Sequence, residues 1–344
     1  MSDRLDSAPE SSGVVPLPRT RGLEEVFAVA DDPVDDLRSA LEDLRREIRT
    51  RLNSAEAGTA ADRSFDWLAL LDEVRHRIGT LGMVERSGDV DEFGMDEVSL
   101  RHSRPLLDFL LDHYWRVDVQ GIDSLPRSGP SLFVANRSGL LPYDGLMLAH
   151  ALDRWQAGEG RPRFLVADWL ITLPFVQPYL ARLGGVRACR ENADRLLRTG
   201  HSVIAFPEGV KGAAKVFRER YRLKRFGRGG VVRAALENRV PLIPVGVVGA
   251  EEAHPILFKA HMVGRAVGLP FVPVTPVFPA LGPLGLLPLP TKWIVVLGAP
   301  IHLDEAEPDA ARDELLVSRL TEELRSEVQR LVNGALEKRT SVWG

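Results

Sequence analysis

The sequence predicts an α/β fold with a mixed, largely parallel sheet flanked by helices. Between residues 115 and 300, short apolar runs alternate with amphipathic segments. Helical patterns precede this region, and a long stretch of leucines at helical spacing follows it. With 344 residues, 44% hydrophobic and 27% charged, the chain can bury a large core. We therefore expect an N-terminal helical extension, an α/β domain and a long C-terminal helix.

The N-terminal part divides into two predicted regions. Residues 1–32 are rich in Ser, Pro, Asp and Arg without periodicity, which indicates a disordered tail. Residues 33–110 form the helical extension, in which amphipathic patterns predict helices over 35–53 and 65–81. A further helix, over 103–115, leads into the next domain. The first residues include acids and lack an apolar core, so a signal peptide is not expected.

Residues 111–344 form the predicted α/β domain. Its expected strands are the short apolar runs at 115–119, 131–135, 163–167, 202–206, 241–248 and 292–297. Its expected helices are at 144–152, 192–199 and 229–238. The stretch 309–338 predicts one helix that closes the domain, and not a coiled coil, because the heptad is not sustained.

The longest uncharged run, residues 266–291, contains seven prolines at 270, 273, 276, 279, 283, 288 and 290. Proline removes amide donors, and a membrane-spanning segment must satisfy its backbone internally, so a transmembrane helix is not expected. Two interpretations stay open. The run is either a buried irregular segment, or an apolar loop that enters a lipid interface or lines an apolar channel.

A first polar motif follows the predicted strand 131–135. The segment Phe133-Val-Ala-Asn-Arg-Ser-Gly-Leu-Leu-Pro-Tyr-Asp144 leads from that strand through a loop to a helix start. Loops at the carboxyl ends of strands are where α/β folds bind ligands. A carboxylate is favoured at a helix start, so Asp144 taken alone would be interpreted as an N-cap.

Three further motifs follow in order. They are Gly185-Val-Arg-Ala-Cys-Arg-Glu-Asn192, Val203-Ile-Ala-Phe-Pro-Glu-Gly209, which ends a predicted strand, and the apolar Val240-Pro-Leu-Ile-Pro-Val245. Each is weakly specific alone. In this order, over roughly residues 115–300, the four segments resemble blocks I to IV of the glycerolipid acyltransferases, the lysophosphatidic acid acyltransferase-like superfamily.

The resemblance implies transfer of a fatty acyl group from acyl-coenzyme A or acyl carrier protein to a glycerolipid or another lipid hydroxyl. It implies no cofactor and no metal site. In the family, the position of Asp144 orients a histidine that takes the proton from the acceptor hydroxyl. The residues implied in substrate binding are Arg187, Arg190, Glu208, Gly209 and Lys211. Of these, Lys211 stands where the family usually has an arginine, so it keeps the charge and loses the bidentate fork.

The chain departs from the family at the catalytic position. Where block I carries its histidine, just after Asn136, this chain has Arg137, whose guanidinium stays protonated at any relevant pH. Three interpretations follow: a protein that binds lipid or acyl donor without turnover, a substitution in an active parent, or another base. His150 and His201 are candidates for that base. Arg137 would otherwise bind a phosphate or pair with Asp144.

Charge and cysteine content limit the partners. The net charge is −4, but residues 211–233 carry nine Lys or Arg and one acid, Glu219. This segment is either a solvated surface or a site for anionic lipid headgroups, acyl-coenzyme A phosphates or an acidic acyl carrier protein. Nucleic acid is not expected, because the aromatic residues match no RNA-binding motif. The single cysteine, Cys189, excludes an intrachain disulfide, fits a reducing cytosol and is expected to be a buried or inert thiol.

Two function hypotheses remain. The first is an acyltransferase at the membrane surface, with an apolar channel beside Arg137 and Asp144. The second is a lipid- or acyl-donor-binding pseudoenzyme with the same channel, in which Arg137 and Asp144 form an ion pair. Both predict a cytoplasmic protein, peripheral at the inner face of the membrane, with membrane lipids as partners and an oligomeric state that the sequence leaves open.

Overall fold

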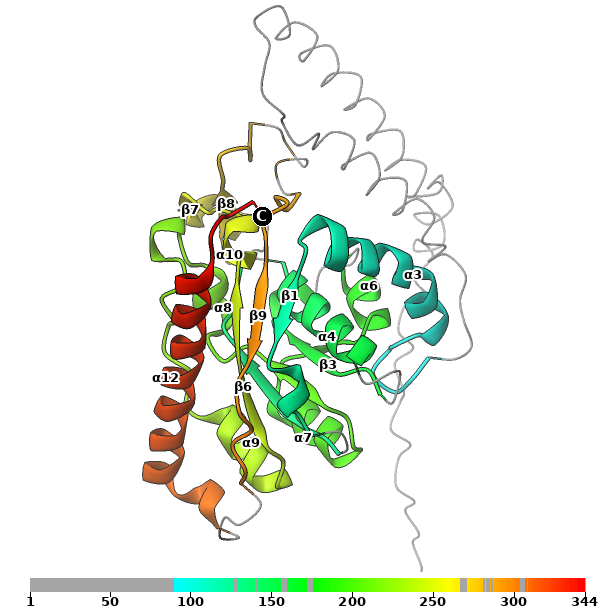
Figure 1. Cartoon of the computed structure of the whole chain (residues 1–344), viewed down its shortest axis with the longest axis vertical. Helices are drawn as coiled ribbons and strands as arrows, with labels where there is room; N and C mark the ends of the chain where they lie inside the picture. Colours follow the sequence, from blue (N-terminus) through cyan, green and yellow to red (C-terminus); the bar gives the residue numbers. More distant parts are fainter. Residues whose placement is uncertain are drawn as a thin grey trace, which may run out of the picture. The chain divides into compact units, whose positions relative to one another are not determined.

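A seven-stranded sheet organises the part of the chain that the structure describes (Figure 1). The computed structural model describes residues 90–126, 129–139, 141–155, 160–171, 176–266, 271–280, 282, 285, 287–303, 307 and 309–343. These residues belong to one unit, 66–344. The predicted tail 1–32 and the predicted helices 35–53 and 65–81 lie outside the described residues, so the domain boundaries stay predictions.

The sheet has the order β1-β9-β6-β2-β5-β3-β4. Its strands are β1 (Asp118–Gln120), β2 (Leu132–Ala135), β3 (Arg163–Val166), β4 (Gly185–Arg187), β5 (Val203–Ala205), β6 (Leu242–Val248) and β9 (Ile294–Leu297). All neighbouring strands are parallel except β6 and β9. The prediction of a mixed, largely parallel sheet is therefore confirmed, although β4 was not predicted.

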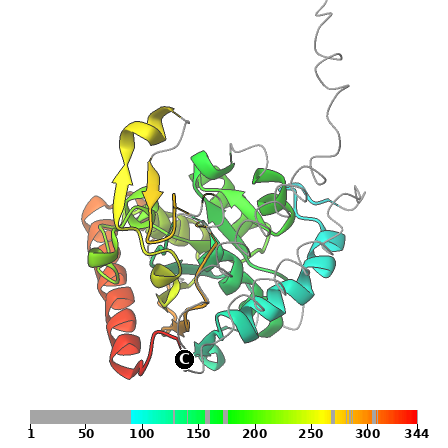
Figure 2. The same cartoon turned by 90° about the horizontal axis from the view of Figure 1, so that it is seen from above.

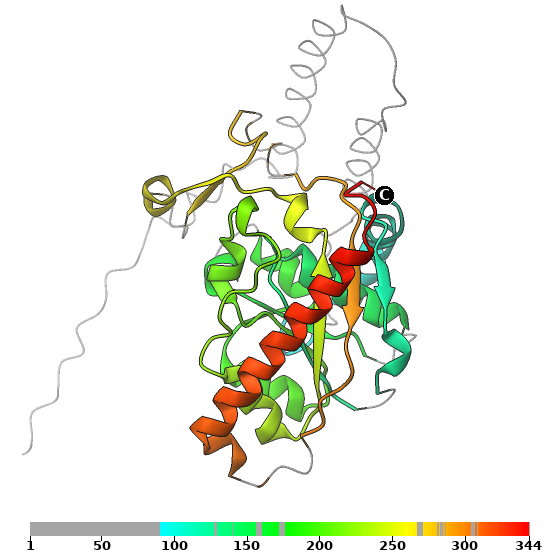
Figure 3. The ribbon, with the colours of Figure 1, turned by 60° about the vertical axis from the view of Figure 1, so that its left-hand side comes forward.

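Helices cover both faces of the sheet. One face carries α3 (Glu97–Phe109), α4 (Tyr143–Trp155) and α6 (Gln177–Arg182), and the other carries α7 (Arg190–Arg198), α9 (Gly230–Asn238) and α12 (Glu314–Lys338) (Figures 1 and 3). Strand β2 shows why its sequence is apolar throughout. Phe133 and Ala135 belong to the core on the first face, while Leu132 and Val134 belong to the core on the second. A strand buried on both faces needs a continuous apolar run.

The helix before the sheet is longer than predicted. It begins at Glu97, not Ser103, because the Asp96 side chain accepts a hydrogen bond from the backbone N–H of Val98 and caps it. It continues from α3 into a π-helical turn that ends at Tyr114. Arg116 then has a φ of 45°, and β1 begins at Asp118 instead of residue 115. Residue 115 thus belongs to the helix end and not to the strand.

The C-terminal helix is confirmed as a single packing helix. Asp313 caps it by accepting hydrogen bonds from the backbone N–H groups of Leu315 and Leu316, after a short 3-10 turn at Ala310–Arg312. It packs closely on β6, where a Cβ on Gly246 would lie 2.9 Å from that of Leu331. Glycine at this position lets the helix approach the strand.

A small hairpin stands apart from the main sheet. Strands β7 (Phe258–Ala260) and β8 (Val272–Val274) pair antiparallel, and the short helix α11 (His261–Ala266) lies between them in the sequence. Figure 2 shows this hairpin projecting from the rest of the α/β domain. The uncharged run 266–291 includes β8, and its described residues from 276 to 290 are mostly irregular and half-buried or exposed. Among the described residues, no helix has the length and apolarity required to cross a bilayer.

Candidate functional site

The loop after β2 is fixed to its neighbour by a buried amide. Asn136 donates from Nδ2 to the carbonyl of Val247 (2.9 Å) and accepts at Oδ1 from the N–H of Val247 (2.7 Å). These two bonds continue the contact between β2 and β6 past the last paired residues of β2. The next residue, Arg137, is therefore held at the carboxyl edge of the sheet, the edge where parallel α/β folds bind ligands.

Asp144 lies at the start of α4 and is buried. Its Oδ2 accepts hydrogen bonds from the backbone N–H (2.8 Å) and the hydroxyl (3.0 Å) of Ser138, and its Oδ1 accepts from the N–H of Gly145 (2.8 Å). The Nη1 of Arg137 also donates to Oδ1, so the two side chains form a buried ion pair. The carboxylate that would orient a histidine in the family is paired with a permanent cation.

Arg137 is anchored from three sides. Besides its bond to Asp144, its backbone N–H donates to Oε1 of Glu208 (2.8 Å). Its guanidinium also lies over the ring of Phe206, 5.1 Å from the ring centre. The side chain therefore links the loop after β2 to the loop after β5, and it lines the cavity described next.

An apolar cavity of about 260 Å³ opens beside Arg137. Its lining comes from β2, β3 and β5, from the loops that follow them, and from the helices α5 (Asp168–Ile171), α7, α8 (Gly209–Ala213) and α9. Most of the lining is apolar, and its smallest residues are Ala167, Ala188, Ala193, Ala205, Gly209, Ala213, Gly230 and Ala234. Arg137 and Arg190 are the charged residues in the lining. Such a lining suits an aliphatic chain whose polar end meets a cation.

Glu208, Lys215 and Glu251 form a buried cluster of charges. The ammonium of Lys215 is 2.7 Å from Oε1 of Glu251 and 3.3 Å from Oε2 of Glu208. Glu208 also accepts from the backbone N–H of Lys224 (2.7 Å). Burial raises the pKa of Glu251, although Lys215 acts in the opposite direction. Glu208 thus ties three loops together.

The structure brings some of the predicted substrate residues together and separates others. Arg190 and Gly209 line the cavity with Arg137. Arg190 also pairs with Glu237 of α9. Arg187 is exposed and forms a bidentate pair with Asp168, its Nε and Nη2 lying 2.9 and 3.2 Å from the two carboxylate oxygens.

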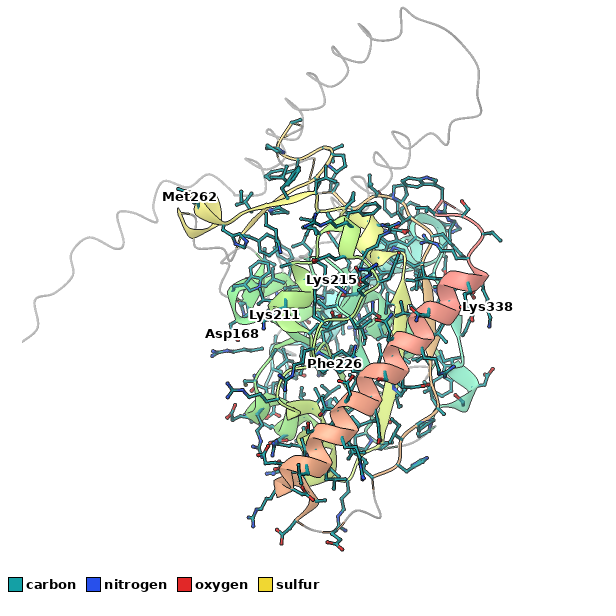
Figure 4. The ribbon with its side chains drawn as sticks, turned by 90° about the vertical axis from the view of Figure 1, so that its left-hand side faces the viewer. Asp168, Lys211, Lys215, Phe226, Met262 and Lys338 are labelled. Atoms are coloured by element: carbon teal, nitrogen blue, oxygen red, sulfur yellow. The ribbon has the colours of Figure 1, made fainter. Side chains whose placement is uncertain are left out.

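Arg187 does not line the cavity, and neither do two further predicted residues, Glu208 and Lys211. Lys211 is exposed on α8 (Figure 4). Glu208 directs both oxygens to groups within the protein. Their predicted roles in binding an acceptor stay predictions.

Comparison with known proteins identifies the family. The crystal structure of the 1-acyl-sn-glycerophosphate (LPA) acyltransferase PlsC from Thermotoga maritima matches 79% of this chain and 97% of that chain, with 17% sequence identity and a TM-score of 0.47. Uncharacterized proteins of Mycobacterium tuberculosis and Mycobacterium leprae are 40% and 41% identical over 255 residues, which is 74% of this chain and 71% and 70% of theirs. The acyltransferase family matches residues 116–248. The chain belongs to the acyltransferase family.

This membership confirms the resemblance carried by the four motifs. Within the acyltransferase domain, blocks I, II and III contain residues of β2, β4 and β5, and each continues into the loop after its strand, at the carboxyl edge of the sheet. The second block includes β4, which the sequence did not predict because the strand has only three residues. The pairing of β3 with β4 brings Arg187 to the same edge as Asp168.

Neither histidine considered from the sequence lines the cavity of this acyltransferase-family protein. His150 is buried, and its Nε2 lies 2.8 Å from Oδ1 of Asp108 on α3. His201 precedes β5, at the edge of the sheet opposite Glu208, and its Nδ1 lies 3.1 Å from the hydroxyl of Thr199. These contacts direct one ring nitrogen of each histidine to another group, and a role of either histidine as the base stays a prediction.

Sequence reasoning missed several residues near the site. Asn136 and Ser138 position the loop, yet they lie within the motif as ordinary polar residues. His254 stacks on Tyr143, with ring centres 5.8 Å apart and planes inclined by 4°, and 111 residues separate the two in the sequence. Cys189 is half-buried and lines the cavity. No short-range pattern marks His254, because its contact forms only in the folded chain.

Several cations of the basic segment, residues 211–233, pair with carboxylates of the protein itself. Lys215 is buried with two carboxylates, Arg233 pairs with Glu314 (2.8 Å) and Lys224 with Glu219 (3.1 Å). The exposed cations of the segment are Lys211, Arg218, Arg220, Arg222, Arg225 and Arg228. Among the residues that the structure describes, no group of His, Cys, Asp and Glu is arranged to hold a metal ion.

Proposed function

We propose that this acyltransferase family member binds a fatty acyl donor, acyl-coenzyme A or acyl carrier protein, and places it next to a site that lacks its base. One observation carries the proposal: the Arg137 guanidinium donates to Asp144 where the family has a histidine oriented by that carboxylate. Support for donor binding comes from the apolar cavity beside Arg137 and from the exposed cations between residues 211 and 228.

The chemistry explains why the ion pair would stop turnover. When a lipid hydroxyl attacks a thioester carbonyl, a C–O bond forms, the C–S bond breaks, and the hydroxyl proton must pass to a base. A guanidinium has no free lone pair to accept that proton. Asp144 has both oxygens occupied by donors from Arg137, Ser138 and Gly145. We therefore propose a pseudoenzyme that works as a lipid or acyl-donor binder at the cytoplasmic face of the membrane.

The test compares acyl-coenzyme A consumption by the chain as given with that by Arg137→His, offering lysophospholipid and monoacylglycerol acceptors. We expect Arg137→His to turn over at least about a hundredfold faster, the usual contribution of a general base. Arg137→Ala is the matched control, because it removes the ion pair without supplying a base. Measurable turnover by the chain as given, at the same rate as by Arg137→His, would overturn the proposal, provided that both bind acyl-coenzyme A.

A second candidate is an active acyltransferase that uses another base. His254 favours it, because its ring stacks on Tyr143, the neighbour of Asp144 in α4. Its Cβ also lies 4.0 Å from the place a Cβ would take on Gly139, within the loop after β2. If the chain as given turns over and His254→Ala abolishes that turnover while acyl-coenzyme A binding persists, this second candidate replaces the first.

A further inference from the structure

The hairpin β7–α11–β8 exposes large apolar side chains. Phe258 is 71% exposed, Met262 is 83% exposed and Leu257 is 43% exposed. They lie within six consecutive residues, and Figure 4 shows Met262 at the outer end of the hairpin. Single exposed apolar residues are common, but a cluster on a projecting element marks an interaction surface.

Backbone hydrogen bonds and close packing hold the hairpin together, so the exposure of these side chains is not the result of poor packing. Phe258 pairs with Val274 in the strand register, and the N–H of Leu257 donates to the carbonyl of Val274 (2.8 Å). Phe271, the residue before β8, is buried. A Cβ on Gly264 would lie 2.5 Å from Cα of Phe271, so α11 packs directly on the backbone before β8. The apolar side chains that remain exposed are held outward by an ordered frame.

Positive charge lies beside the apolar cluster. The backbone N–H of Phe217, within the basic segment, donates to the carbonyl of Ile256 (2.7 Å), two residues before Phe258. This bond places the exposed Arg218 next to the hairpin, and the exposed Arg222 follows four residues later in the same segment. Lys259 lies on β7 itself. Its charge is one of those that lower the pKa of Glu219, which is the one acid in residues 211–233. Between residues 216 and 225, five Lys or Arg stand against that single acid.

We propose that the hairpin tip and the adjacent basic segment dock the protein on a membrane surface that carries anionic headgroups. Leu257, Phe258 and Met262 would enter the apolar boundary, while Arg218, Arg222 and Lys259 meet headgroup charges. The combination of an apolar tip and a cationic border matches the two layers of an anionic lipid interface.

The same surface adjoins the cavity. Val210 lines the cavity and is partly exposed, and the chain from it passes through α8 to the bond between Phe217 and Ile256. In Figure 4, Met262, Lys211 and Asp168 lie toward the same side of the molecule. A membrane docked on the hairpin would therefore lie near the cavity mouth. This last step rests on the proposed function, which requires a lipid or acyl ligand.

The test is co-sedimentation of the full chain with phosphatidylcholine vesicles and with vesicles that also contain phosphatidylglycerol. We expect preferential binding to the anionic vesicles. The double variant Phe258→Asp, Met262→Asp should weaken that binding at least tenfold, with unchanged thermal unfolding. Leu315→Asp is the matched control, because Leu315 is 84% exposed on α12. Arg218→Glu with Arg222→Glu should remove the preference for anionic vesicles, and Arg312→Glu, a charge reversal near the start of α12, should not.

Three results would overturn the inference. One is unchanged vesicle binding by the hairpin variant, and another is an equal loss in Leu315→Asp. The third is a change in oligomeric state of the hairpin variant during sedimentation without vesicle binding, which would make a second copy the occupant. Acyl-coenzyme A binding without vesicles is measured separately. If that binding is absent while vesicle binding depends on the hairpin, the proposed function fails and the docking surface stands.

Discussion

Arg137 and Asp144 form a buried ion pair at the carboxyl edge of the sheet, with side chains 10% and 0% exposed. Asp144 has more hydrogen-bond donors around its carboxylate than the one that Arg137 supplies. Asp144 accepts three further hydrogen bonds, from the N–H and hydroxyl of Ser138 and the N–H of Gly145. Asp144 keeps these three donors if Arg137 is removed, whereas a neutral residue in place of Asp144 takes the ion pair away from a guanidinium that stays charged.

The first prediction follows from this inequality. Asp144→Asn removes the carboxylate charge that pairs with the buried guanidinium of Arg137, and we expect a loss of about 3 kcal/mol in the free energy of unfolding. Arg137→Met leaves a carboxylate that still accepts three bonds, and we expect a loss of about 1 kcal/mol. Urea unfolding of both single variants and of the double variant measures the difference. Equal losses in the two single variants would show that the pair, and not the Ser138 loop, stabilises Asp144.

The fold was predictable from the sequence wherever apolar runs are continuous. Strands β2 and β5 are buried on both faces, so their composition alone identifies them. The elements that were missed or misplaced depend on strand length, backbone conformation and helix capping. Strand β4 has three residues, and β1 starts late because Arg116 takes a positive φ. The start of α3 depends on a cap by Asp96, which resembles a turn residue in a stretch rich in acids and glycine.

The site was predictable only in part, because its motifs are local and its contacts are not. The four motifs identified the loops and the replacement at Arg137. They did not show that the carboxylates of Glu208 and Glu251, 43 residues apart, share the ammonium of Lys215. Nor did they show His254 against Tyr143. Such contacts arise from the order of strands in the sheet, which a single sequence does not specify.

The second prediction concerns the buried cluster of Lys215 with Glu208 and Glu251. Lys215→Met leaves two buried carboxylates without their common cation, and we expect a loss of about 3–5 kcal/mol in the free energy of unfolding. Lys224→Met is the control, because its ammonium pairs with Glu219 in a partly exposed position and should cost less than about 1 kcal/mol. Chemical denaturation compares the two. Losses of similar size would mean that the cluster contributes no more than a surface ion pair.

The third prediction is a pH dependence that originates at His150. Burial is the main cause that lowers its pKa, and the hydrogen bond with Asp108 opposes it, with Arg154 and Arg161 also nearby. The unfolded chain therefore binds a proton at His150 more readily than the folded one. The contribution of His150 to stability is present above about pH 6.5 and is lost as the pH falls toward the lower folded value.

His150→Gln removes this titration. Between pH 7.5 and 5, the free energy of unfolding of the unaltered chain should fall relative to that of His150→Gln, by at most about 1.4 kcal/mol per pH unit. Denaturant titrations at several pH values measure the two slopes. Parallel slopes would assign the acid sensitivity to other groups.

The fourth prediction concerns what enters the cavity. Ala188 is exposed and lines the cavity next to Cys189, so a larger side chain there obstructs the cavity without being forced into the core. We expect Ala188→Trp to lower the affinity for a long-chain acyl-coenzyme A at least tenfold and to leave the affinity for free coenzyme A unchanged. In the proposed complex the acyl chain would lose its place in the cavity, while the exposed cations proposed to bind the phosphates are unchanged. Calorimetric titration with both ligands measures the separation.

Arg198→Trp provides the matched control, since it adds the same side chain at an exposed position of α7 that is not part of the cavity lining. It should leave both affinities within about twofold of the unaltered chain, because surface substitutions away from a site usually change free energies by less than about 0.5 kcal/mol. If Ala188→Trp weakens acyl-coenzyme A and coenzyme A equally, the cavity does not hold the acyl chain and the variant disturbs phosphate binding instead. If neither variant changes either affinity, the acyl chain binds elsewhere, and the apolar lining between α7, α8 and α9 is a packing defect of the core.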